Sequence, residues 1–233
     1  AAISVYTGIS FTILGLSATS LSAFAGALIA ISFVYSISRF RFGFSGETLL
    51  LTGVAISFFF SSLILFIQYL SNVADSFQII RWLMGSLTVV GYQELKQLLP
   101  FVMLTAVVII YLSRELNLLM AGDEIATSRG VSVKYVRYAL FFVTSLCVGA
   151  IVALCGPIGF VGMMVPHICR LIIGEDHRYL IPATLLFGGS FLVICDTLAR
   201  LVIAPAELPV GVITTLLGGP FFLWLLMRYK SQH

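Results

Sequence analysis

Long apolar runs fill most of the sequence, and they restrict the folds that it can adopt. A transmembrane helix needs about 20 mostly apolar residues, because inside a bilayer every backbone N–H and C=O group must be hydrogen bonded within the protein. The runs fall at residues 1–16, 21–37, 48–70, 98–112, 138–154, 158–173, 180–203 and 210–227. Only 10% of the residues are charged, compared with about 25% in soluble domains. We therefore expect an all-α, polytopic transmembrane helix bundle with about eight spans.

The basic residues predict how this bundle is oriented. Cytoplasmic loops of membrane proteins carry an excess of Lys and Arg. Alternating the expected helices leaves Arg81, Lys96 and Arg200 on one side and places the rest of the 13 basic residues on the other. Residues 122–137 and the C-terminus then face the cytoplasm. The net charge of only +3 gives no indication of a nucleic-acid partner.

The longest polar passage is GDEIATSRGVSVKYVR, residues 122–137, between two apolar runs. Asp123 and Glu124 suit the positive end of a short helix, and Gly130 suits its C-terminal end. An exposed small residue such as Ala126 would let a partner approach closely. We interpret the passage as a docking loop outside the bilayer, with a solvated connector as the alternative.

A second interrupted region is CGPIGFVGMMVPHICRL. Gly156 and Pro157 break one helix, and Pro166 removes a backbone hydrogen bond from the next. Within a membrane such breaks are tolerated only in protein or beside a water-filled cavity, so this region is buried or lines a path. His167 and Cys169 offer two metal ligands where four are usual, which favours a hydrogen-bonded structural histidine.

Two features lie on the predicted outer side. Residues 77–87 are either a short helix at the membrane interface, with Trp82 at headgroup depth, or a plain loop. Asp196 and Arg200 lie on one helix face at i,i+4. They either neutralise each other or leave Arg200 free to accept a carboxylate from an external partner.

The sequence offers no set of catalytic residues. It contains neither GxxxxGK[ST] nor HExxH, so we expect no nucleotide hydrolysis, cofactor or metal site in this chain. The cysteines occur without CxxC spacing inside apolar runs and are interpreted as small buried hydrophobes. They are Cys147, Cys155, Cys169 and Cys195.

Six motifs follow one another over more than half of the chain. They are SREL (113–116), GDEIATSRGV (122–131), GPIGFVGMMVPHICRL (156–171), DHRYLIP (176–182), DTLAR (196–200) and APAELPVGVITTLLGGPFFLWLL (204–226). Together they closely resemble the FecCD-type permeases, the membrane subunits of ABC importers for iron chelates, haem and vitamin B12. Such permeases have ten helices. The resemblance implies that residues 1–233 are a single permease domain holding the third to tenth helices, with the N-terminal helices missing.

The resemblance also implies roles for individual residues. Residues 122–131 match the cytoplasmic coupling helices that the ATPase grips, and Arg200 matches the position that meets a glutamate of the binding protein. The implied coupling residues are Gly122, Asp123, Glu124, Ala126, Arg129 and Gly130. The implied cytoplasmic gate is Ser45, Gly46 and Glu47, although relatives carry small hydroxyl residues where Glu47 stands. The implied pathway residues, on helices 48–70 and 210–227, are Thr52, Ser57, Ser61, Thr214 and Thr215.

By this resemblance we expect the transport subunit of an ATP-driven importer in the bacterial cytoplasmic (inner) membrane. Its expected partners are membrane lipid, a second permease subunit, two cytoplasmic ATP-binding subunits and an external solute-binding protein. The cargo, a siderophore, haem or cobalamin, and the choice between homodimer and heterodimer stay open. The alternative is an ion-coupled secondary transporter, which needs mid-membrane acidic or histidine relays. Asp196 and His167 are the candidates, and neither has a second acid within its own helix.

Overall fold

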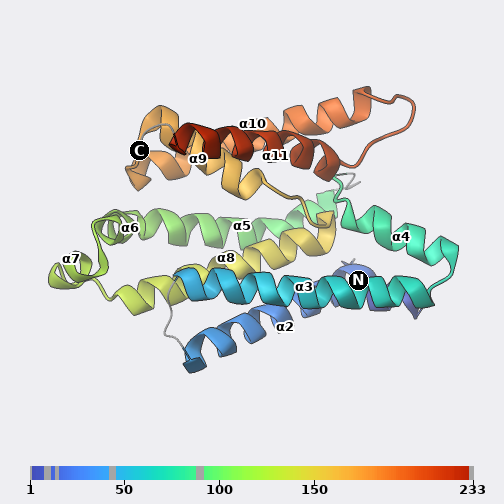
Figure 1. Ribbon diagram of the computed structural model, residues 1–233, viewed down its shortest axis with the longest axis horizontal. Coiled ribbons are helices and arrows are strands. Elements are labelled where there is room, and N and C mark those ends of the chain that lie inside the picture. Colours follow the sequence, from blue (N-terminus) through green and yellow to red (C-terminus); the bar gives the residue numbers. More distant parts are fainter. Residues whose placement is uncertain (1, 8–11, 14–15, 42–45, 88–91, 231–233) are drawn as a thin grey trace. The chain divides into compact units, whose positions relative to one another are not determined.

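The computed structural model describes residues 2–7, 12–13, 16–41, 46–87 and 92–230 (Figure 1). Nearly all of these residues are helical, which confirms the expected fold class. The helices are α1 (Ala2–Tyr6), α2 (Ala18–Arg41), α3 (Gly46–Leu70), α4 (Val73–Leu83), α5 (Tyr92–Tyr111), α6 (Ser113–Met120), α7 (Asp123–Ser128), α8 (Val133–Cys155), α9 (Val161–Ile173), α10 (His177–Leu201) and α11 (Val210–Lys230).

Five helices among the described residues are long and apolar enough to cross a membrane, namely α2, α3, α5, α8 and α10. The apolar segments Val161–Ile173 and Val210–Leu225, in α9 and α11, are shorter. The chain is thus a multi-pass membrane protein. The expected eight spans, and their numbering as the third to tenth helices, are not confirmed by this count.

The prediction of a helix over residues 1–16 is wrong. The first helix, α1, ends at Tyr6, and β1 (Thr12–Ile13) pairs antiparallel with β2 (Leu16–Ser17). The run is shorter than the roughly 20 residues that a span requires. It also contains Gly8 and Gly15, and glycine disfavours a helix interior because its unfolded backbone has more freedom to lose.

Large apolar side chains remain exposed along α3. Leu50, Leu51 and Phe58 are 72%, 73% and 70% exposed. In water, exposed apolar surface costs about 25 cal/mol per Å², and a contiguous patch of this kind marks a membrane or protein contact. The helix therefore suits a lipid or protein environment.

Two compact units make up the chain, and each is described by itself. The first comprises Ala1–Leu83, Val90–Val102 and Phe141–Leu154. Here α2 packs on α3 and also meets α8, since the ring centroids of Tyr35 and Phe142 are 5.3 Å apart. A Cβ atom at Gly149 would lie 3.1 Å from the Cβ of Ala27. This is the close approach through small residues that membrane helices use.

The expected glycine-mediated packing is nevertheless confined to certain positions. A Cβ atom would meet nothing within 4 Å at five of the helical glycines that the sequence suggested as contacts. These are Gly26, Gly53, Gly162, Gly189 and Gly219. Small residues thus permit close helix packing without requiring it within this chain.

The second unit comprises Met84–Val89, Met103–Leu140 and Cys155–His233. In it α10 packs against α9, α11 and α6, and α6 packs against α7. Val165, Cys169 and Leu180 form the buried core of the α9–α10 pair. All four cysteines of the chain are free and buried, which confirms their interpretation as small hydrophobes.

Backbone groups of three chain segments meet inside the second unit. The Ser86 N–H donates to the Cys155 carbonyl at 2.7 Å, and the Gly211 N–H donates to the Gly85 carbonyl at 3.3 Å. A side chain at Gly211 would overlap with the Met84 carbonyl oxygen. At the helix break Gly156 is buried and Pro157 is half-buried, whereas Gly159 is exposed. The break is therefore packed in protein on one side and open on the other.

The segment predicted to lie on the outer side contains a helix rather than a plain loop. Helix α4 covers Val73–Leu83, beginning earlier than residues 77–87 and ending before Gly85, whose φ is +67°. Ile79 is only 2% exposed, and α4 contacts α1 and α3. One face of α4 is thus packed within the first unit.

Candidate functional site

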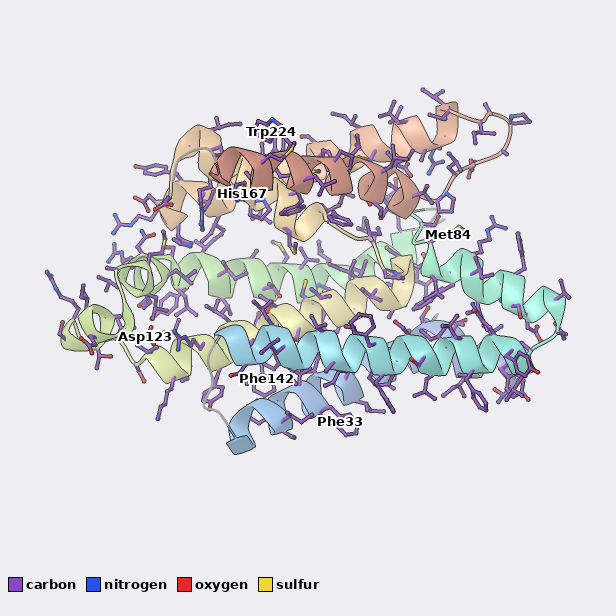
Figure 2. All side chains as sticks on the ribbon, viewed as in Figure 1. Phe33, Met84, Asp123, Phe142, His167 and Trp224 are labelled. Carbon is purple, nitrogen blue, oxygen red and sulfur yellow. The ribbon has the colours of Figure 1, made fainter. Side chains whose placement is uncertain are left out.

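The polar passage folds into a short helix set between two others. Helix α6 ends at Met120, α7 runs from Asp123 to Ser128, and α8 begins at Val133. Figure 2 shows Asp123 at the start of α7. Asp123 and Glu124 occupy the first turn of α7, where partial positive charge on the free N–H groups favours carboxylates. The predicted start of the helix is thus confirmed.

A Schellman motif ends α7. The Val131 N–H donates to the Ala126 carbonyl at 3.0 Å, and the Gly130 N–H donates to the Thr127 carbonyl at 2.9 Å. The motif needs a residue in the left-handed backbone conformation directly after the C-cap of the helix. Gly130 occupies this position with a φ of +83°. The prediction that Gly130 ends this helix is confirmed, together with its physical reason.

An ion pair fastens the start of α7 to the first turns of α8. Arg137 Nη2 donates to Asp123 Oδ1 at 2.8 Å, with both side chains partly exposed. The side chains of Glu124 and Arg129 are exposed and form no ion pair within the described residues. The charged side chains of Glu124 and Arg129 are therefore available to a partner. The Asp123 carboxylate instead forms an ion pair within the loop.

The expectation that Ala126 presents an exposed face is wrong. Its exposure is 0%, because α7 packs on α6 and the small side chain is enclosed there. The exposed side of α7 instead carries Ile125, which is 49% exposed, beside Glu124 and Ser128. An exposed isoleucine within a polar passage is a contact candidate that we did not identify from the sequence.

Arg200 is bound to two carboxylates of its own chain. Its Nε donates to Asp196 Oδ2 at 2.8 Å, and its Nη1 lies 3.8 Å from Glu207 Oε1. The Asp196–Arg200 pair predicted from the spacing is thus confirmed. Glu207 was not predicted as a partner. The guanidinium side chain remains 46% exposed, so an external carboxylate still has access to it.

The expected gate is described only in part. Ser45 lies outside the described residues, and Gly46 and Glu47 are the first residues of α3. Their role as a gate stays a prediction.

The expected pathway residues divide into exposed and buried ones. Ser57 and Ser61 lie beside Gly53 on an open, mainly apolar hollow of α3, and Thr52 is half-buried. Thr214 is 0% exposed, and its hydroxyl donates to the Gly211 carbonyl at 3.1 Å. The expectation that Thr214 lines an open path is therefore wrong, since its hydroxyl is used inside the helix.

Thr215 is exposed, and its hydroxyl also donates to the Gly211 carbonyl, at 2.7 Å. This bond satisfies the hydroxyl proton while leaving oxygen lone pairs for another partner. Thr215 thus stays a candidate for the pathway.

His167 packs against an aromatic ring. Its ring centroid lies 6.3 Å from that of Phe221 in an edge-on arrangement, and Figure 2 labels His167 on α9. Across the described part of the chain, no group of three His, Cys, Asp or Glu side chains could hold a metal ion. This ring contact is a packing contact, and the hydrogen bond expected for His167 stays a prediction.

Comparison with known protein families identifies the family of this chain. The sequence model of the FecCD transport family matches residues 1–228. The chain belongs to the FecCD transport family.

Several members of the FecCD family are close in sequence to this chain. It is 39% identical over 94% of its length to the hemin transport system permease protein HmuU of Yersinia pestis, covering 66% of that protein. It is 43% identical over 88% of its length to the cobalamin import system permease protein BtuC of Halobacterium salinarum, covering 55%. It is 38% identical over 90% of its length to the Fe(3+) dicitrate transport system permease protein FecD of Escherichia coli, and it covers 65% of that protein. The chain thus spans less than two thirds of these FecCD relatives.

A solved structure, described as an inward-facing conformation of a metal-chelate type ABC transporter, has the same fold. The TM-score is 0.86 at 29% identity, over 97% of this chain and 71% of the other. The FecCD resemblance predicted from the six motifs is therefore confirmed at the level of family and fold.

Proposed function

We propose that this chain is the membrane-spanning permease subunit of an ATP-driven ABC importer in a bacterial cytoplasmic membrane. The observation that carries the proposal is α7, a capped helix whose Glu124, Ile125 and Arg129 are exposed. It interrupts a succession of apolar helices, so a partner outside the bilayer can reach it. The FecCD membership supports this role.

The proposed mechanism needs no chemistry in this chain. ATP binding and hydrolysis take place in two separate cytoplasmic subunits that grip α7. Their motion displaces α7, and the helices transmit the displacement to a pathway between two permease copies. An external solute-binding protein delivers the cargo near Arg200, whose exposed guanidinium suits a carboxylate.

The proposed cargo is an iron chelate, haem or cobalamin. The related permeases named above are assigned to hemin, cobalamin and ferric dicitrate. The hollow on α3 offers Ser57 and Ser61 within mainly apolar surroundings. Hydroxyl groups give weak hydrogen bonds without trapping charge, so such a surface suits passage better than tight binding.

Charge reversal on α7 tests this proposal. We expect Glu124→Lys combined with Arg129→Glu to lower co-purification of the ATP-binding subunit by about tenfold, as for contacts central to an interface. Uptake into proteoliposomes should fall with it. The matched control is Asp75→Lys, an acidic residue in the first turn of α4 on the opposite predicted side of the membrane. Wild-type co-purification of the α7 variant would contradict the proposal.

A further inference from the structure

A polar cluster connects α6 to the first turn of α10. Asn117 Nδ2 donates to Asp176 Oδ1 at 2.7 Å, across 59 residues of sequence. Asn117 Oδ1 accepts from the His177 backbone N–H at 2.9 Å and lies 2.7 Å from His177 Nδ1. All three residues belong to the second compact unit. One side chain of α6 thus makes three contacts with the start of α10.

The chemistry of these contacts is specific to an amide at position 117. The His177 backbone N–H can only donate, so the amide oxygen of Asn117 must face it and the amide nitrogen must face Asp176. The imidazole then carries its proton on Nδ1 and donates it to the same oxygen. An ionised aspartate at position 117 would have no proton to offer Asp176, and serine would be too short to bridge both partners.

Asp176 is also the N-cap of α10. Its Oδ1 accepts from the Arg178 backbone N–H at 3.0 Å, the usual way in which aspartate satisfies a free N–H at a helix start. This backbone hydrogen bond, and next the hydrogen bond from Asn117, lower the pKa of the Asp176 carboxyl. The carboxylate therefore stays ionised and keeps accepting both hydrogen bonds at neutral pH.

The position of the cluster gives it mechanical significance. Asn117 lies in the last turn of α6, one short link before α7 begins at Asp123. Asp176 and His177 lie where α10 begins, after the turn from α9. Beyond this turn, α9 and α10 share the buried core of Val165, Cys169 and Leu180. The Asn117 cluster therefore lies between the α6–α7 segment and a packed membrane hairpin.

We infer that Asn117 is a positioning residue that passes movement of α7 to the α9–α10 hairpin, through its hydrogen bonds to Asp176 and His177. The inference rests on the proposed function, because α7 must be moved by a partner. Asn117 itself does not contact the ATP-binding subunit. Its loss should uncouple ATP hydrolysis from transport while leaving the docking surface intact.

The test uses the complete transporter in proteoliposomes, with hemin, cobalamin and ferric dicitrate offered in parallel. The measured quantity is the amount of compound taken up per ATP hydrolysed. We expect Asn117→Asp to lower this ratio about fivefold or more, a typical size for coupling between sites. Co-purification of the ATP-binding subunit should stay within about twofold of wild type, because the exposed face of α7 is unchanged. Asn117→Ser, which introduces no charge, should act in the same direction.

Asp176→Asn is the matched control. Asparagine retains the oxygen that accepts from Arg178 and Asn117, and it is as good an N-cap as aspartate, so the ratio should stay within about twofold of wild type.

Two outcomes would overturn the inference. The first is a wild-type ratio in both Asn117 variants, and the second is a loss of thermal stability with no change in the ratio. Failure of the proposed function is distinguishable, because the wild-type transporter would then take up none of the three compounds when ATP is supplied.

Discussion

Two neighbouring glycines of α11 should respond in opposite ways to the same substitution. A Cβ atom at Gly218 would overlap with the side chain of Phe160 and lie 2.7 Å from its Cδ1, whereas a Cβ at Gly219 would meet nothing within 4 Å. Carbon atoms prefer separations of about 3.5–4.0 Å. Gly218→Ala therefore requires movement of about 1 Å, and Gly219→Ala requires none.

Phe160 has little freedom to move away. It is the N-cap of α9 with a φ of 65°, a conformation that non-glycine residues seldom adopt. Its ring centroid also lies 5.9 Å from that of Phe222. The atoms that the new methyl group would meet are close to the backbone, so a rotamer change cannot remove the overlap.

The magnitude follows from two opposing contributions. Replacing glycine by alanine inside a helix stabilises by about 0.5–1 kcal/mol, and this gain is shared by both variants. Overpacking costs about 1–3 kcal/mol, and only Gly218→Ala incurs it. The two variants should thus differ by about 1–3 kcal/mol, which corresponds to roughly 2–12 °C in Tm on the scale of soluble proteins of this length.

Thermal unfolding in detergent, followed with a thiol-reactive dye, measures this difference directly. The four free cysteines are buried, and three of them, Cys155, Cys169 and Cys195, lie in the second unit. Dye labelling therefore reports mainly on loss of packing in that unit. We expect Gly219→Ala to melt at or above the wild-type temperature and Gly218→Ala below it. Equal melting temperatures, or greater damage at Gly219, would refute the described contact between α11 and Phe160.

Three further predictions concern the loops. Gly130→Ala should destabilise α7 by about 1 kcal/mol, because the backbone φ of residue 130 is positive. Faster amide hydrogen exchange in α7 would show this loss of stability. Unchanged exchange would contradict the Schellman cap. The pKa of the Asp176 carboxyl is lowered in the folded state. The stability that this carboxylate contributes is therefore present above its unfolded pKa and is lost as the pH falls through its folded pKa. Protection of the first α10 amides from hydrogen exchange should drop below about pH 4, and Asp176→Asn should abolish that pH dependence. Glu207→Gln should strengthen association with the solute-binding protein about two- to fivefold at low salt, because it releases Arg200 from a competing carboxylate. Unchanged affinity would show that Arg200 does not contact the solute-binding protein.

The sequence predicted features that depend on local chemistry. The apolar run 48–70 became α3 (Gly46–Leu70), since helix formation in a membrane needs only continuous apolar residues. The start of α7 at Asp123 and its end at Gly130 follow from helix-end electrostatics and backbone geometry. The i,i+4 pair of Asp196 and Arg200 likewise needs only a helix.

Features that depend on packing were not predicted. A short helix gives little periodicity, so the sequence could not show that Ala126 faces inward and Ile125 outward. Thr214 was expected in a pathway because of its hydroxyl, yet that hydroxyl bonds to its own helix. Asn117 and Asp176 are 59 residues apart, and separate polar residues carry no signal of their pairing.

The most direct test of the whole account is the source of energy for transport. The transporter is reconstituted with and without its ATP-binding subunit, and uptake of hemin, cobalamin and ferric dicitrate is measured with ATP, without ATP, and with ionophores that abolish ion gradients. The account predicts uptake of at least one compound that requires both the ATP-binding subunit and ATP, and that persists in the presence of ionophores. Uptake that proceeds without the ATP-binding subunit and stops when ion gradients are abolished would contradict it.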